Sequence, residues 1–247
     1  MNFKKTMFAL AIGSVGIMGA MSASAAVVNT GDVLSITAGV PAFDGSGTQT
    51  NVSSGSWFGM DNSGDSKIQG TEKVALSQGT TGLVIGVTTS AGASHPGAPT
   101  AGDTNAITAP WSFFGNTGSD YAIVAVTGDT VTGLNMSGWT VTWSGIPAIP
   151  MGTGAWTPLN AATIGMPAGP YTNGLAKFSW NGIDGGAYTL DYTATVPLGD
   201  ASGFGGVKYA LHLQGNVAMV PEASTYGMML AGLGMVGFMA SRRRKSV

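Results

Sequence analysis

The sequence has 247 residues, of which 9% are charged, and it contains no cysteine; its formal net charge is −2 at pH 7. The missing cysteine excludes disulfide bonds, thiol catalysis and cysteine-bound metals. Between residues 26 and 220, four lysines stand against eleven acidic residues with no arginine, a net charge of −7. We therefore predict no nucleic-acid partner, because neutralising phosphates requires clustered Lys and Arg.

The first 25 residues have the three parts of a secretory signal peptide. Lys4 and Lys5 form a basic start, residues 7–21 are apolar, and residues 23–25 read Ala-Ser-Ala, the small residues that signal peptidase needs. We predict cleavage before Ala26 and export of the segment that follows. A retained N-terminal anchor fits less well, because the apolar stretch is short.

The exported body, residues 26–219, has the pattern of an all-β domain. Short alternating runs are separated by Gly, Asn, Asp, Ser and Pro, which is typical of an antiparallel β-sandwich or a jelly-roll-like fold. Long glycine-rich loops are predicted at 41–55, 90–109 and 145–173. The last of these is rich in proline, so a division into two subdomains near 150–172 stays open. Strands are predicted at 33–37, 56–60, 83–89, 121–126, 139–143, 177–180 and 187–196.

The clearest alternation lies in two successive strands near the end of the body. In each strand, apolar residues occupy one face and polar residues the other. The apolar positions are Tyr188, Leu190, Tyr192 and Val196 in the first strand, and Tyr209, Leu211, Leu213 and Val217 in the second. The polar positions are Thr189, Asp191, Thr193 and Thr195, and then Lys208, His212, Gln214 and Asn216. We predict an antiparallel hairpin with a long connection at 197–206.

Residues 61–72 have the spacing of a calcium-binding loop. Asp61, Ser63, Asp65 and Glu72 occupy the first, third, fifth and twelfth positions, where such loops supply oxygen ligands. The sixth position, which normally needs glycine for a sharp turn, holds Ser66, and strands are predicted on both flanks in place of helices. A solvated acidic turn is therefore the other interpretation. Calcium is the one cofactor that the sequence suggests.

Few other side chains indicate chemistry by their pattern. His95 lies in a turn-like loop and His212 on the polar face of a strand; neither has a partner at metal-binding spacing, so both are predicted to be surface residues. Trp139 and Trp143 share one face of a strand, which favours core packing over an exposed platform for sugar rings. No Gly-x-Ser-x-Gly nucleophile motif occurs. We predict that the protein is not an enzyme.

Residues 220–247 contain three signals in a fixed order. Residues 220–224 read Val-Pro-Glu-Ala-Ser, an apolar stretch follows, and the tail 242–247 is basic. From about residue 225 to 241 the stretch is long enough for a transmembrane helix, since about 17 to 20 residues cross a bilayer. We predict this helix, with the basic tail on the cytoplasmic side. The basic residues of the tail are Arg242, Arg243, Arg244 and Lys245.

This arrangement resembles the C-terminal sorting signal of PEP-CTERM proteins, which are exported bacterial proteins recognised by a membrane-embedded exosortase. The motif residues are Val220, Pro221, Glu222 and Ala223; the family usually has Pro-Glu-Pro, and Ala223 stands in place of the second proline. The resemblance implies transient anchoring by the C-terminal helix, cleavage by exosortase at or near the motif, and transfer of the body to an acceptor or its release. An ordinary anchor that is never processed is the alternative.

These features predict an exported surface or extracellular-matrix protein with a structural or binding role. Members of the resembled family commonly accompany exopolysaccharide production, so the resemblance implies an exopolysaccharide as a partner. A secreted hydrolase of polysaccharides is the alternative function. It would need two carboxylates in a cleft lined by tryptophans, because glycoside hydrolysis uses a pair of carboxyl groups.

Overall fold

The structure is a computed structural model that describes residues 25–76, 82–88, 108–113, 116–122, 125–143, 146–220 and 227–236. Residues 1–24 of the predicted signal peptide, His95 and the basic tail 242–247 lie outside the described residues. Most of the regular structure in the described residues is antiparallel β-strand, which confirms the all-β prediction. The finer sandwich or jelly-roll architecture stays a prediction.

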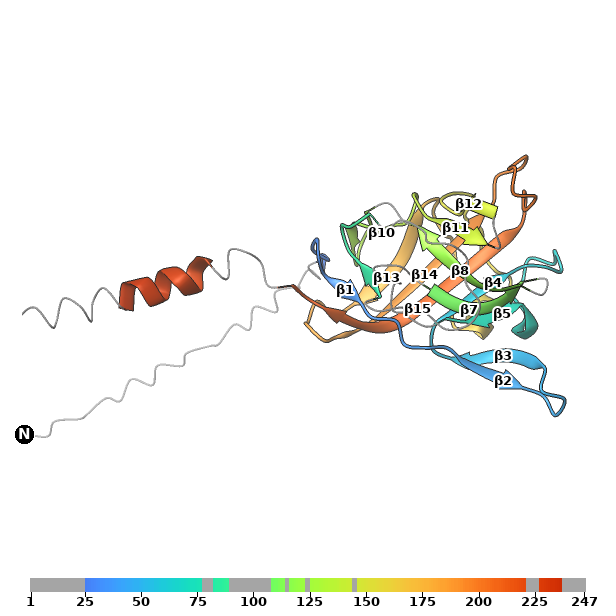
Figure 1. Cartoon of the computed structure of the whole chain (residues 1–247), viewed down its shortest axis with the longest axis horizontal. Helices are drawn as coiled ribbons and strands as arrows, with labels where there is room; N and C mark the ends of the chain where they lie inside the picture. Colours follow the sequence, from blue (N-terminus) through green and yellow to red (C-terminus); the bar gives the residue numbers. More distant parts are fainter. Residues whose placement is uncertain are drawn as a thin grey trace, which may run out of the picture.

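The largest element within the described residues is a nine-stranded antiparallel sheet (Figure 1). Its main path runs β5-β4-β15-β14-β13-β10-β9, and β1 and β6 continue the sheet beside the far end of β15. The bounds along the path are Lys73–Ala75, Trp57–Met60, Lys208–Ala218, Ala187–Thr195, Leu175–Trp180, Gly133–Asn135 and Gly128–Asp129. Strand β1 is Val33–Leu34 and β6 is Leu83–Val84.

The predicted antiparallel hairpin is confirmed as β14 and β15, and it forms the centre of this sheet. The strands pair without interruption from Thr195 opposite Lys208 to Ala187 opposite Asn216. The predicted apolar face is buried in the main core. The opposite face is covered as well, because residues 151–172 pack across it with a second apolar cluster. The surface position predicted for His212 is therefore wrong: its exposed fraction is 6%.

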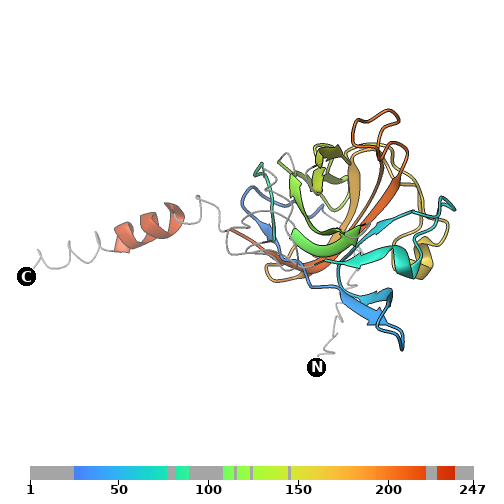
Figure 2. The ribbon, with the colours of Figure 1, turned by 45° about the vertical axis from the view of Figure 1, so that its right-hand side comes forward.

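Two smaller antiparallel sheets complete the body. The first has the order β12-β11-β8-β7 and lies over the main sheet (Figures 1 and 2). Its strands are Ile146–Pro150, Thr140–Trp143, Asn116–Ala122 and Thr108–Phe113. The second is the hairpin of β2 (Val40–Phe43) and β3 (Gln49–Ser54), which projects from the body in both views. The prediction of a loop at 41–55 is thus wrong, because the polar strand β3 lacks the apolar alternation that marks a strand in sequence.

The main core lies between the nine-stranded sheet and the sheet that contains β11. Trp139 is 1% exposed and meets Phe58 edge-on, with ring centroids 6.2 Å apart. Tyr192 packs against the same indole, and its hydroxyl donates to the carbonyl of Met151 at 2.7 Å. The core-packing interpretation of Trp139 is confirmed, while the side chain of Trp143 lies outside the described part of the structure.

A second, smaller cluster fills the opposite side of the main sheet. It joins Trp57 and Ile68 to the short 3-10 helix η2 (Ala161–Ile164) and to Tyr171. The other short helix, η1 (Gly70–Glu72), leads into the edge strand β5. This side of the sheet is therefore only partly filled by apolar groups, and polar residues of β14 and β15 are buried beside them.

The C-terminal segment contains a short helix at residues 227–236. Among the described residues, no helix has the length and apolar character needed to cross a membrane. The predicted span at about 225–241 extends beyond the described residues on both sides of this helix. The transmembrane prediction is therefore not confirmed.

Candidate ligand pocket and sorting motif

Three polar side chains, of which Asp191 and His212 are buried and Gln214 is half-buried, form a chain of hydrogen bonds across the centre of the main sheet. Asp191 on β14 and His212 on β15 stand directly opposite each other in the register. The His212 Nδ1 atom lies 2.7 Å from Asp191 Oδ1, and His212 Nε2 lies 3.0 Å from Gln214 Nε2. The Gln214 amide also donates to the carbonyl of Gly55 at 3.3 Å, so the chain ends on the main chain beside β4.

The hydrogen-bond partners of His212 show which of its ring nitrogens carries the hydrogen. An ionised Asp191 only accepts hydrogen bonds, so Nδ1 carries the hydrogen and Nε2 accepts one from the Gln214 amide. Burial raises the pKa of Asp191, and the hydrogen bond from His212 opposes this shift. Both ring nitrogens are thus occupied within the protein, and the imidazole in this arrangement has no lone pair directed at a substrate.

Trp57 connects this chain to a lysine. Its indole stacks on the His212 ring with centroids 5.8 Å apart and an angle of 25°. On the same indole, the Lys73 Nζ atom lies 4.6 Å from the ring centroid, a distance at which a cation is attracted to the aromatic face. Burial lowers the pKa of Lys73 because desolvation disfavours the ammonium form. Lysine, indole and imidazole therefore form one continuous column.

A pocket of about 410 Å³ opens above this column. This volume lies within the usual range for small-molecule sites. Its inner wall contains Trp57, Lys73 and His212, and its exposed rim contains residues of β3 and η2. The remaining lining residues are Asn51, Val52, Ser53, Ser54, Gly55, Thr163, Ile164, Gly165, Thr189 and Gln214.

Gly55 allows the β3 wall to stand beside the sheet. It has a φ of +76°, and a Cβ atom at this position would lie 2.1 Å from the carbonyl oxygen of Ala38. Only glycine fits this backbone conformation and this close approach. The turn at Gly55 thereby places hydroxyl and amide groups of β3 at the rim, to which η2 also contributes residues.

The pocket is suited to holding a polar ligand by hydrogen bonds. Six of its 13 lining residues carry a hydroxyl or amide side chain, and none of the described residues that line it is Asp or Glu. Asp191 lies behind His212 and is 2% exposed. The alternation in sequence placed His212, Gln214 and Thr189 on one face, but it gave no signal for Trp57, Lys73 or Thr163, which come from distant segments.

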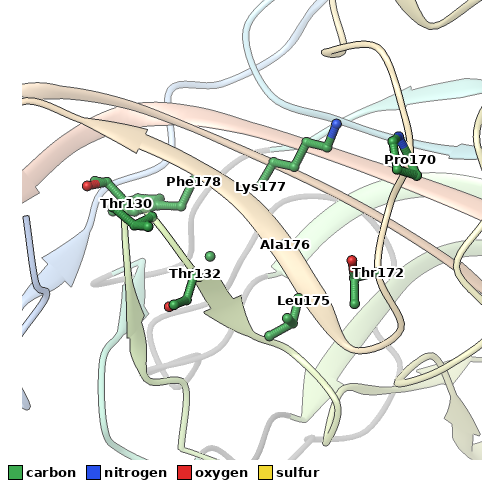
Figure 3. Close-up of a pocket in the computed structure, with 10 residues that line it drawn as sticks. Thr130, Thr132, Pro170, Thr172, Leu175, Ala176, Lys177 and Phe178 are labelled. Atoms are coloured by element: carbon green, nitrogen blue, oxygen red, sulfur yellow. The ribbon is translucent and has the colours of Figure 1, made fainter. Parts of the chain in front are cut away.

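A second pocket, of about 190 Å³, lies between the β9–β10 turn, β13 and the segment at Pro170 (Figure 3). Thr130, Thr132 and Thr172 contribute hydroxyl groups, and the Lys177 side chain extends toward Pro170. That lysine already donates to the carbonyl of Ala168 and lies over the Tyr171 ring, 4.5 Å from its centroid. The smaller pocket is therefore the weaker candidate.

The predicted calcium loop has the sharp turn, and its carboxylates hold the backbone of the loop. Ser66 adopts a φ of +62°, as the sixth position of such a loop requires. The buried carboxylates of Asp61 and Glu72, however, accept backbone N–H groups of the loop at 2.8 to 3.0 Å. Their donors are Ser63, Ser66 and Gln69. Asp65 instead accepts the N–H of Lys67 at 3.0 Å.

These contacts hold the loop closed by its own hydrogen bonds. In the part of the chain that the structure describes, no three His, Asp or Glu side chains gather where they could hold a metal ion. Within the loop, Ser63 Oγ donates to Asp61 Oδ1 at 3.4 Å, so two of the four predicted ligands are in contact. Calcium binding by this loop stays a prediction.

Val220, the first residue of the predicted sorting motif, is fixed to the fold, and the rest of the motif follows it. The Val220 N–H donates to Asp32 Oδ1 at 2.9 Å. Pro221, Glu222 and Ala223 lie outside the described residues, as do Arg242, Arg243 and Arg244.

Residues 220–245 match the family model described as the PEP-CTERM protein-sorting motif. The chain carries a PEP-CTERM sorting signal. It is therefore an exported protein that is targeted to exosortase, with membrane-associated sorting to the cell surface. Comparison with curated proteins gives no match, and comparison with solved structures gives none either. The PEP-CTERM match covers the tail only, so the role of the body is inferred from its own geometry.

Proposed function

We propose that the body of this PEP-CTERM protein is a non-catalytic binding module of the cell surface, built on a sandwich-type scaffold of two sheets. Its ligand is a hydroxyl-rich group, of the kind that a sugar unit of an extracellular polysaccharide presents. The observation that carries the proposal is the pocket of about 410 Å³, whose hydroxyl and amide rim stands above the buried column of Lys73, Trp57 and His212.

The chemistry of the pocket supports binding over hydrolysis. Glycoside hydrolysis uses two carboxyl groups on either side of the scissile bond. The described lining residues include no carboxylate, and the nitrogens of His212 are engaged by Asp191 and Gln214. Amide and hydroxyl groups around an aromatic floor are suited to orienting a polar ligand, because a few convergent polar groups determine specificity.

Two substitutions on η2 test this function. Ala162 and Thr163 are neighbouring exposed residues, but only Thr163 lines the pocket. Thr163→Trp places a large side chain at the rim, whereas Ala162→Trp adds the same group outside the pocket. Binding of the full chain to polysaccharide isolated from its own host is measured by affinity electrophoresis. We expect Thr163→Trp to weaken binding by about tenfold or more, and Ala162→Trp to leave it unchanged.

Three results would contradict the proposal. One is wild-type protein that does not bind the polysaccharide, or that binds it equally well after Thr163→Trp. Another is release of new reducing ends from the polysaccharide by the wild-type protein, because this would demonstrate hydrolysis. Loss of binding in both tryptophan variants would likewise contradict it, because the pocket would not be the cause.

A further inference from the structure

The final residues of the body are held on both edges. On one edge, β1 pairs with the end of β15, with Leu34 opposite Val217. On the other edge, the Gly185 N–H donates to the Val217 carbonyl at 2.8 Å, and the Val217 N–H donates to the Gly186 carbonyl at 3.0 Å. The chain therefore leaves the body from between two fixed segments.

After β15 ends, two carboxylates accept hydrogen bonds from the next backbone N–H groups. Asp184 Oδ1 accepts the N–H of Met219 at 2.8 Å, and Asp32 Oδ1 accepts the N–H of Val220 at 2.9 Å. Asp32 is fully buried, and its other oxygen accepts the N–H of Asn29 at 2.8 Å. We name this group, Asp32 and Asp184 with the two amides that they hold, the exit clip.

The exit clip ends where the sorting signal begins. The PEP-CTERM match starts at Val220, and Pro221 and Glu222 follow it directly in the sequence. No linker residue separates the clip from the motif. Because the motif follows without a gap, any cleavage there takes place next to the folded body.

The start of the body is fixed at the same end of the molecule. The Ala26 N–H donates to Thr130 Oγ1 at 3.0 Å, and the Thr130 N–H donates back to the Ala26 carbonyl at 3.1 Å. A Cβ atom built on Gly182 would lie 3.2 Å from the Ala26 side chain, so the turn that carries Asp184 also contacts the first residue of the body. Figure 1 shows the two ends of the described body on one side.

We infer that Asp32 and Asp184 are positioning residues that control the rate of exosortase processing. A cleaving enzyme must take up extended chain on both sides of the bond, and residues held in a fold are exposed to it only when the fold opens locally. Met219 and Val220 therefore leave the clip before cleavage. In the cleavage step, water or an acceptor nucleophile forms a bond to the carbonyl carbon, and the bond from this carbon to the amide nitrogen breaks. The proton of the nucleophile passes to the leaving nitrogen.

The test uses the full chain in its own host, where exosortase is present. Asp184 is exposed, so Asp184→Ala removes one acceptor of the clip with little effect on the core. Processing is followed by pulse-chase labelling and intact mass. We expect the half-time for loss of the tail to shorten by about two- to tenfold, since one hydrogen bond contributes that much to an opening equilibrium. Asp32→Asn should act in the same direction.

A spacer separates this effect from a general loss of stability. Inserting about six Gly and Ser residues between Val220 and Pro221 gives exosortase free chain. This insertion should speed processing at least as much as Asp184→Ala, and adding Asp184→Ala to it should have no further effect. The control is Asp200→Ala, because Asp200 accepts the N–H of Ser202 at 2.9 Å in the loop at the other end of the hairpin.

The inference is overturned if the spacer or Asp184→Ala leaves processing unchanged or slows it. It is also overturned if Asp200→Ala speeds processing equally, because the cause would then be general loosening. Resistance of the exported chain to added protease confirms that each variant is folded. The outcome does not depend on the ligand of the pocket, so this inference and the proposed function fail separately.

Discussion

At the level of single residues, the chain from Asp191 through His212 to Gln214 shows how a polar group is accommodated inside the sheet. Each group finds a partner of the opposite kind, and the imidazole also stacks on Trp57. Buried polar groups are costly when one partner is missing, because the remaining group keeps its desolvation penalty without a hydrogen bond. The stability of the body therefore depends on this chain as a unit.

Removing Asp191 should destabilise the body strongly. Asp191→Ala leaves the Nδ1 of His212 buried without its acceptor, so we expect the free energy of unfolding to fall by about 3 kcal/mol. Ser179→Ala, an exposed position on the neighbouring β13, should change it by less than about 0.5 kcal/mol. Urea unfolding of both variants measures the difference. A loss of similar size in the two variants would mean that the pair contributes nothing specific.

Asp191 should make the free energy of unfolding depend on pH. Burial raises the pKa of Asp191 in the folded state above the value of 3.8 that it has when unfolded. The folded protein then binds the proton more tightly, so the contribution of Asp191 is complete below pH 3.8 and is lost as the pH rises through the folded pKa. The free energy of unfolding of the wild type, measured relative to that of Asp191→Asn, should therefore fall as the pH rises across this range. The opposite slope would mean a lowered pKa.

At the level of elements, β15 pairs with three other strands. It pairs with β14 along one edge, while β4 and then β1 share its other edge. The second edge is crowded near Gly215, where an added Cβ atom would lie 1.9 Å from the carbonyl oxygen of Ser35. This glycine is therefore required by the approach of the segment after β1.

Gly215→Ala should separate that segment from β15. We expect a loss of about 2 kcal/mol in the free energy of unfolding, because the clash is with backbone that cannot move away without breaking hydrogen bonds. Gly45→Ala is the matched control, since no atom lies within 4 Å of its added Cβ. Chemical denaturation of both variants gives the comparison. Equal stability would mean that the β1 edge adapts freely.

The loop at 61–72 gives a prediction about calcium. Its carboxylates already hold the loop backbone, so millimolar calcium or a chelator should shift the thermal midpoint by less than about 1 °C. Glu72→Gln should lower the midpoint with or without calcium, because it weakens the acceptors for Ser63 and Gln69. Differential scanning calorimetry measures both effects. A rise of several degrees with calcium that disappears in Glu72→Gln would establish the metal site after all.

At the level of the whole molecule, a predicted signal peptide and the PEP-CTERM signal enclose an acidic, weakly charged body. The PEP-CTERM signal directs the chain to exosortase, and the fold reaches from Ala26 to Val220 with hydrogen bonds at each end. The body is thus folded up to the two predicted processing sites. This favours release of a compact domain without flexible tails.

The mass of the protein in its native host should reflect this processing. We expect a mature form that begins at Ala26 and ends at or near Glu222, because the tail beyond the motif is removed. Replacing Pro221 and Glu222 with alanine should retain residues 226–247 in the membrane fraction. Intact-mass spectrometry of each cell fraction distinguishes the two forms. A wild-type protein that keeps its tail would make the segment a plain anchor.

Several elements were predictable because short contiguous patterns encode them. The hairpin of β14 and β15 follows from strict alternation over two long strands, and β4 and β13 follow from shorter runs. The hairpin of β2 and β3 was not predicted, because β3 consists mostly of polar residues. Its sequence therefore lacks the alternation of apolar and polar residues that marks a strand. Strand β12 was likewise hidden within a stretch rich in proline.

The sequence alone determined the export route and the all-β class of this protein, because signal segments and strand alternation are local properties of the chain. Tertiary structure decided the burial of His212, since the covering segment at 151–172 comes from outside its own hairpin. It also decided the pocket, whose wall joins β3, β5 and η2 through long-range packing. Neither arrangement leaves a mark on the local pattern, because contacts between distant segments depend on how the whole chain closes around its core.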